Sequence, residues 1–163
     1  MLFREDDKVV HNEHRGYIEN LDDLPFIDYS IIGGCNLRSP FFSGNYKNPY
    51  LIFSSRGCVN RCKYCAVHNK KYRYRSPKNV IDEYERLINE YGAGYLQFAD
   101  AMFMGHTVRS IEICEEIIRR KLNRVPWNCE AHINFITPDL LKIMKKSGCE
   151  SVFCFRRTFS ADH

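Results

Sequence analysis

The stretch LIFSSRGCVNRCKYC at residues 51–65 joins a short apolar segment to three closely spaced cysteines. Its first four residues are typical of a buried β-strand, because a brief apolar run fits the interior of a sheet. Cys58, Cys62 and Cys65 follow in the spacing Cys-x3-Cys-x2-Cys. We therefore expect a loop directly after the strand on which the three sulfurs lie close together.

Helices and strands alternate in the sequence beyond this loop. Ser76 and Pro77 suit the start of a helix, and apolar residues recur at helical spacing until Gly92. The apolar positions of this helix are Val80, Ile81, Tyr84, Leu87, Ile88 and Tyr91. Further expected elements are a strand at Tyr95–Ala99, a helix from Thr107, a strand at Trp127–His132, a helix from Thr137 to Gly148 and a strand at Ser151–Phe155. For the second helix we expect an apolar face of Val108, Ile111, Cys114, Ile118 and Leu122.

This alternation predicts an α/β fold in which right-handed βαβ crossovers build a parallel sheet whose strands pair in sequential order. In such sheets the chemistry lies outside the carboxyl ends of the strands, which is where the cysteines fall. We divide the chain into a loop-rich lead-in at 1–50, a core at 51–155 and an atypical tail at 156–163.

Composition narrows the class of protein. With 163 residues, 44% of them hydrophobic, the chain can form one domain with its own core. It has no apolar run of about 18 residues and begins with charged residues, so neither a membrane span nor secretion is expected. Eight cysteines without an export signal favour a reducing cytoplasm. The net charge of +4 is too small to indicate a nucleic-acid partner by itself.

Three thiolates on one short loop can hold three corners of a cubane iron-sulfur cluster, whose usual complement is four cysteines. The iron left open is then free to bind a substrate or cofactor directly, as at catalytic zinc sites. One alternative is zinc, with His68 completing a Cys3His set. Another is that the cysteines are reduced core residues, which suits Cys114, Cys129, Cys149 and Cys154.

Residues 54–65 and 72–80 resemble the radical S-adenosylmethionine (SAM) superfamily. Residues 18–29 resemble the linker between the cobalamin-binding domain and the barrel in one branch of it, and the likeness extends over residues 3–155. The resemblance implies a partial (β/α) parallel barrel, the first four strands of a (β/α)6 barrel. It also implies a 4Fe-4S cluster at the mouth of that barrel, held by the three cysteines.

The resemblance implies a radical SAM enzyme in which SAM chelates the open iron through its amino and carboxylate groups. An electron from the cluster would cleave SAM to methionine and a 5'-deoxyadenosyl radical, which abstracts hydrogen from a small-molecule substrate that the sequence does not identify. Tyr64 would lie near the SAM adenine and Asp100 near its methionyl end. A hydrogen-bonded loop aspartate is the alternative for Asp100. The electron donor would be of the flavodoxin or ferredoxin type.

The sequence departs from the family pattern at several points. Arg156–Ser160 stands where a Gly-rich segment is expected, and Ala101 stands where relatives carry a second aspartate. Cobalamin is implied for full-length relatives, but its Asp-x-His-x-x-Gly motif does not occur here. We therefore expect a fragment that lacks the cobalamin domain and the last two strands. Such a fragment should bind a cluster weakly and should not turn over substrate alone.

Residues 56–81 contain eight Lys or Arg and no acidic residue, with tyrosines between them. Such a surface suits RNA, and the tRNA methylthiotransferases share the cysteine motif, so an RNA-interacting module that binds zinc or a cluster is the alternative function. An inactive remnant without metal is a further alternative. Basic residues would also offset the negative charge of a thiolate-bound cluster and of the SAM carboxylate, so we do not expect a nucleic-acid partner.

Overall fold

The computed structural model describes residues 2–13, 15–32, 46–63, 65–67 and 70–154. The predictions made for Tyr64, for His68 and for the tail at 156–163 lie outside these residues.

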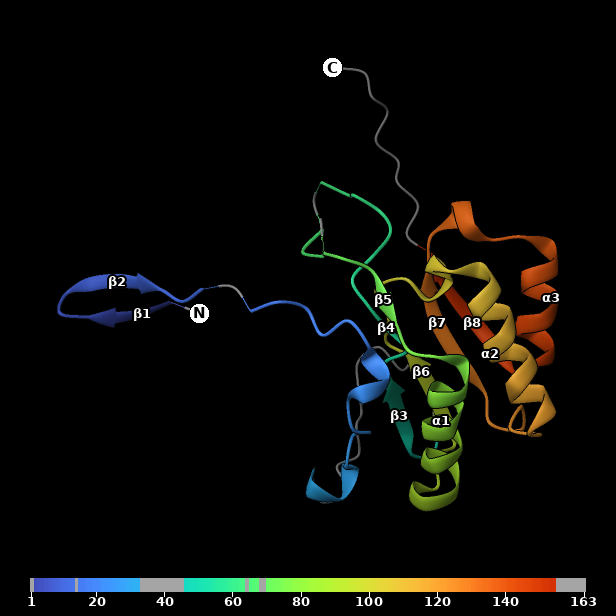
Figure 1. Cartoon of the computed structure of the whole chain (residues 1–163). Helices are drawn as coiled ribbons and strands as arrows, with labels where there is room; N and C mark the ends of the chain where they lie inside the picture. Colours follow the sequence, from blue (N-terminus) through green and yellow to red (C-terminus); the bar gives the residue numbers. More distant parts are fainter. Residues whose placement is uncertain (1, 14, 33–45, 64, 68–69, 155–163) are drawn as a thin grey trace.

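Four parallel strands form the central sheet (Figure 1). They are β3 (Pro49–Ile52), β6 (Tyr95–Phe98), β7 (Trp127–Ala131) and β8 (Cys149–Cys154). Neighbours in the sequence are neighbours in the sheet, and every pair is parallel. The predicted α/β class, the strand order and the parallel pairing are therefore confirmed.

Three helices connect the strands and pack in sequence order: α1 (Pro77–Tyr91), α2 (Thr107–Arg119) and α3 (Pro138–Lys146). The predicted ends of α1 are confirmed, because the Ser76 hydroxyl accepts a hydrogen bond from the Asn79 amide at 3.2 Å and Gly92 is left-handed, with φ of 65°. For α3, Thr137 caps the first turn and Gly148 follows the last, with φ of 95°.

Aromatic residues join the helices to the sheet. The Phe98 ring lies 6.2 Å from the Tyr84 ring of α1 and 5.1 Å from the Trp127 ring of β7. The Trp127 indole donates a hydrogen bond to the Ser147 carbonyl, just beyond α3, at 2.9 Å. The helices therefore pack against one face of the sheet, and the loops lie at the carboxyl ends of its strands.

The buried face of α2 differs from the predicted one. Of the predicted face, Cys114 and Leu122 are buried and Ile111 and Ile118 are half-buried, but Val108 is 61% exposed. The helix also buries Arg109, Ser110, Ile113 and Ile117. Apolar periodicity does not indicate Ser110 or Arg109, but Ser110 donates to the Phe103 carbonyl at 3.0 Å and Arg109 donates to the Arg75 carbonyl at 2.7 Å. Polar residues with such partners can be buried without a large loss of stability.

We expected residues 1–50 to be rich in loops, but part of this lead-in has regular structure. It contains an antiparallel hairpin of β1 (Leu2–Glu5) and β2 (Lys8–His11), which stands apart from the sheet in Figure 1. Asp6 and Asp7 form its two-residue turn with positive φ, the geometry that favours tight hairpins. Two short 3-10 helices follow at Leu21–Asp23 and Tyr29–Ile32.

Among the described helices, none combines the length and the apolar character needed to cross a membrane.

Candidate functional site

The cysteines lie on a long loop between β3 and α1, which we call the cysteine loop (residues 57–72). Two short strands, β4 (Ser55–Arg56) and β5 (Arg73–Tyr74), pair antiparallel and close its base. We call this base, residues 54–56 and 73–75, the neck. Gly57 follows it with φ of +78°, and a Cβ built there would lie 2.2 Å from the Lys71 carbonyl oxygen. The two strands of the neck are thus held close together.

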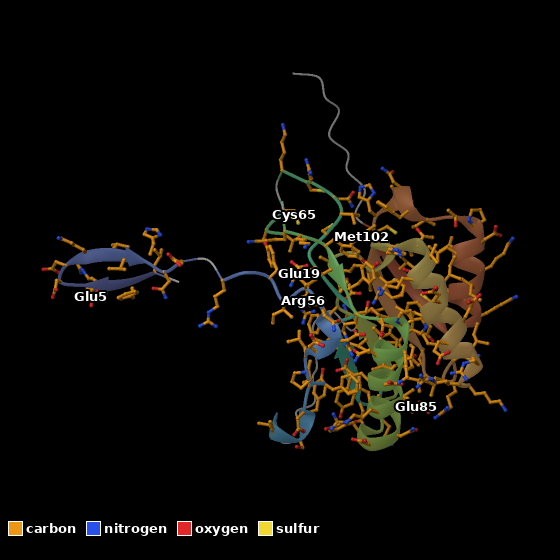
Figure 2. All side chains as sticks on the ribbon, viewed as in Figure 1. Glu5, Glu19, Arg56, Cys65, Glu85 and Met102 are labelled. Carbon is orange, nitrogen blue, oxygen red and sulfur yellow. The ribbon has the colours of Figure 1, made fainter. Side chains whose placement is uncertain are left out.

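Cys58, Cys62 and Cys65 are half-buried free thiols that line one pocket of about 250 Å³. Figure 2 shows Cys65 on the loop and Met102 on the neighbouring part of the core. The other residues that line the pocket are Asn60, Val67, Ala101, Met102, Glu130, Ala131 and His132. Ala101 and Met102 follow β6, and Glu130, Ala131 and His132 end or follow β7, so the pocket lies at the predicted edge of the sheet.

The donor chemistry of this pocket suits an iron-sulfur cluster, since three thiols from one loop face a shared space. Within the described ranges, however, no three Cys, His, Asp or Glu side chains stand where they could jointly hold a metal ion. The structure therefore brings the three cysteines to one pocket but does not show the close convergence of their sulfurs that we expected. The ligand set stays a prediction, as does the zinc alternative that needs His68.

Asp100 follows β6, as predicted, and is almost fully buried. Its Oδ1 accepts hydrogen bonds from the backbone amides of Ser54 at 2.7 Å and Ser55 at 2.8 Å, and its Oδ2 accepts one from the Ser54 hydroxyl. Burial raises the pKa of this carboxyl. These contacts match the alternative of a hydrogen-bonded loop aspartate, while a contact with the SAM methionyl end stays a prediction.

Glu130 was not predicted as a site residue, although it lines the same pocket as the cysteines. Burial, followed by the nearby charge of Asp100, raises the pKa of its carboxyl. The rule that sites lie at the carboxyl ends of parallel strands could have indicated Glu130, which is next to last in β7. The same rule applies to His132, one residue beyond that strand.

Some of the basic residues at 56–81 contact other parts of the same chain. Lys71 forms an ion pair with Glu19 at 2.6 Å, and Arg73 donates to the Ile18 carbonyl at 2.5 Å while stacking over the Tyr17 ring. The segment that resembles a family linker therefore lies along the neck and the loop.

The pattern that defines the Radical SAM superfamily matches residues 52–156. This span contains the last residue of β3, the strands β6, β7 and β8, the cysteine loop and the helices α1, α2 and α3. The chain belongs to the Radical SAM superfamily.

Named relatives agree with this assignment. The anaerobic magnesium-protoporphyrin IX monomethyl ester cyclase of Cereibacter sphaeroides is 37% identical over 153 residues, which are 91% of this chain and 24% of that protein. An uncharacterized methyltransferase of Pyrococcus horikoshii is 27% identical over 159 residues, 94% of this chain and 33% of that protein. The chain thus spans a third or less of the length of these relatives.

Among solved structures, the chain is similar to the radical SAM methyltransferase TsrM of Kitasatospora setae, solved with its tryptophan substrate and a SAM analog. The TM-score is 0.61 at 22% identity, over 66% of this chain and 21% of TsrM. A second TsrM structure holds cobalamin and a 4Fe-4S cluster. This likeness supports the fold, a partial barrel.

Proposed function

We propose that Cys58, Cys62 and Cys65 bind a 4Fe-4S cluster, that SAM binds its open iron, and that the protein cleaves SAM reductively. The observation that carries this proposal is the pocket that all three thiols line, at the carboxyl edge of a parallel sheet in a member of the Radical SAM superfamily. Zinc bound at the same loop is the competing proposal, since three thiols suit either metal.

The bound cofactors would supply the chemistry: one electron breaks the bond between the SAM sulfur and its 5' carbon, leaving methionine and a 5'-deoxyadenosyl radical that takes hydrogen from substrate. The residues of this chain would bind the cofactors and exclude water. Ala101 and the buried Met102 give the pocket an apolar wall beside the thiols. Tyr64 is proposed to lie against the SAM adenine.

For Asp100, the hydrogen bonds to Ser54 and Ser55 favour a role in fixing the backbone that leads to the cysteines. A direct contact with SAM would have to be added to these bonds, because both carboxylate oxygens already accept hydrogen. Within the described part of the chain the Glu130 carboxylate has no such partners, and it lines the pocket itself, which makes it the better candidate to meet a donor group of a bound molecule.

The electron donor is proposed to be an acidic flavodoxin or ferredoxin. Arg61, Lys63 and Lys70 are exposed on the cysteine loop, and positive charge there would steer an acidic carrier toward the cluster. A cytoplasmic location is part of the proposal, since every cysteine in the described residues is a free thiol. The relatives named above are methyltransferases and a cyclase, so the reaction that follows radical formation is left open.

The test is anaerobic reconstitution with iron and sulfide, reduction with dithionite, and addition of SAM. We expect the electron paramagnetic resonance (EPR) spectrum of the reduced cluster to change when SAM binds, with slow formation of 5'-deoxyadenosine. Both signals should be absent from Cys62→Ala. An EPR spectrum that does not change when SAM is added, or bound zinc in place of iron, would contradict the proposal.

A further inference from the structure

Arg109 lies in the first turns of α2, and its side chain is buried although it carries a charge. Its Nε donates to the Arg75 carbonyl at 2.7 Å and its Nη2 donates to the Ser54 carbonyl at 2.7 Å. Ser54 directly precedes β4, which enters the cysteine loop, and Arg75 directly follows β5, which leaves it. One guanidinium therefore joins both strands of the neck.

A second buried arginine extends this arrangement. The Arg75 amide donates to the Ser54 carbonyl at 3.0 Å, and its Nη1 donates to the Phe53 carbonyl at 2.9 Å. Its guanidinium also forms a buried ion pair with Glu83 of α1. The backbone just before the cysteines is thus held by Arg109 of α2 and by Arg75 of the neck, and Glu83 of α1 fixes the Arg75 side chain.

Such an arrangement costs free energy in an ordinary core, because a buried charge loses its hydration. Burial lowers the pKa of Arg109, and its Nη1 has no hydrogen-bond partner within the described residues. An apolar side chain would fill the space at less cost. A planar fork of donors, however, can reach two carbonyls from two nitrogens held at a fixed spacing, which an apolar residue cannot do and which the single nitrogen of lysine does not reproduce.

We propose that Arg109 is a positioning residue for the cysteine loop. By fastening the entering and leaving strands of the neck, it holds the loop over the pocket at the ends of β6 and β7. The loop is thereby presented to a cluster before any cluster binds. This inference rests on the proposed function in one respect, namely that the ligand of the loop is an iron-sulfur cluster.

The first experiment uses hydrogen exchange on the full chain without cluster, in Arg109→Met and Arg109→Lys. The control is Arg120→Met, which removes a largely buried arginine from the opposite end of α2, where it pairs with Asp82, Glu85 and Glu116. Arg109→Met removes the hydrogen bonds to the Ser54 and Arg75 carbonyls, and it should speed hydrogen exchange of the Ser54, Ser55 and Arg75 amides about tenfold. Arg109→Lys should give a smaller increase, because its ammonium can still donate to these carbonyls but lacks the fixed spacing of Nε and Nη2.

Exchange in β7 and α3 should stay at the wild-type rate in both Arg109 variants. The control should speed exchange where α1 meets α2 and leave the neck unchanged. Equal neck exchange in wild type and both Arg109 variants would overturn the proposal. So would a control that loosens the neck as much as Arg109→Met does.

The second experiment follows iron loss to a chelator after reconstitution. We expect loss to be about tenfold faster in Arg109→Met than in wild type, with a broadened EPR spectrum, and unchanged in Arg120→Met even where its melting temperature falls. Equal rates in Arg109→Met and wild type would count against the proposal. Should wild type itself take up no cluster, the proposed function fails, while the exchange experiment still decides the role of Arg109.

Discussion

Oδ1 of Asp100 lies 2.7 Å from the backbone nitrogen of Ser54 and accepts its hydrogen. This bond ties the end of β6 to the end of β3 at the point where the chain turns toward the cysteines. The same oxygen accepts from the Ser55 amide at 2.8 Å, so a single atom orients two consecutive peptide groups.

Substitutions of Asp100 should therefore show whether its hydrogen bonds or its negative charge stabilise the fold. In Asp100→Asn the amide oxygen can still accept from both backbone amides and its NH2 can donate to the Ser54 hydroxyl, so we expect a loss of stability within about 1 kcal/mol. Asp100→Ala leaves these buried groups without a partner and should cost about 3 kcal/mol. Urea unfolding followed by the fluorescence of Trp127, the single tryptophan, measures both. Equal losses in the two variants would contradict this account of Asp100.

The ion pair of Arg75 with Glu83 is nearly inaccessible to solvent, with side-chain exposures of 10% and 3%. Glu83→Leu leaves the arginine charge buried without its partner and should cost about 3 kcal/mol. The matched control is Glu90→Leu on the same helix, which breaks an exposed pair with Arg86 and should cost less than about 0.5 kcal/mol. Comparable losses in the two urea titrations would show that the buried pair does not stabilise the neck.

Gly57 combines a positive φ with a close approach to the Lys71 carbonyl, so a side chain there must distort the entrance of the cysteine loop. Gly57→Ala should cost about 1–3 kcal/mol of local strain and should speed labelling of Cys58, Cys62 and Cys65 by a thiol reagent. The buried Cys114 should label at an unchanged rate. Gly16→Ala is the control, since a Cβ there meets no atom within 4 Å. Unchanged labelling of the loop cysteines in Gly57→Ala would argue that the neck is not tight.

Glu116 provides a test of pH dependence. Hydrogen bonds from Arg119, together with those from Arg120, lower the pKa of its carboxyl to about 2 from an ordinary value of 4.5. The native state thus binds this proton less readily than the unfolded chain, and the stabilisation is complete above the ordinary pKa and lost as pH falls toward about 2. Glu116→Gln should melt at a lower temperature than wild type near neutral pH, and this difference should disappear in acid. A difference that is constant with pH would refute the assignment.

How far the sequence predicted the structure can be argued from particular residues. Apolar periodicity and caps such as Ser76 and Gly92 act locally, and they predicted the strands, their order and the ends of α1 correctly. Periodicity could not predict that α2 turns Arg109 inward, because that depends on the carbonyls of Ser54 and Arg75, which are distant in sequence.

The candidate site shows the same division. The spacing of the cysteines predicted that they share one place at the edge of the sheet, and the pocket confirms that much. The position of Asp100 at the end of its strand was also predicted, but the direction of its carboxylate depends on the amides of Ser54 and Ser55. Glu130 was missed because a lone glutamate in a strand has no spacing pattern.

The most direct test of the central claim is to measure iron, sulfide and zinc in the anaerobically reconstituted chain, with EPR spectra after reduction. Wild type and the buried-cysteine control Cys114→Ala should hold the same amounts of iron and sulfide, in a one-to-one ratio and up to about four of each per chain, and should give the spectrum of a reduced 4Fe-4S cluster. Cys62→Ala should lose both the iron and the spectrum. Zinc in place of iron in wild type, or equal iron in Cys62→Ala and wild type, would contradict the assignment of the three cysteines as cluster ligands.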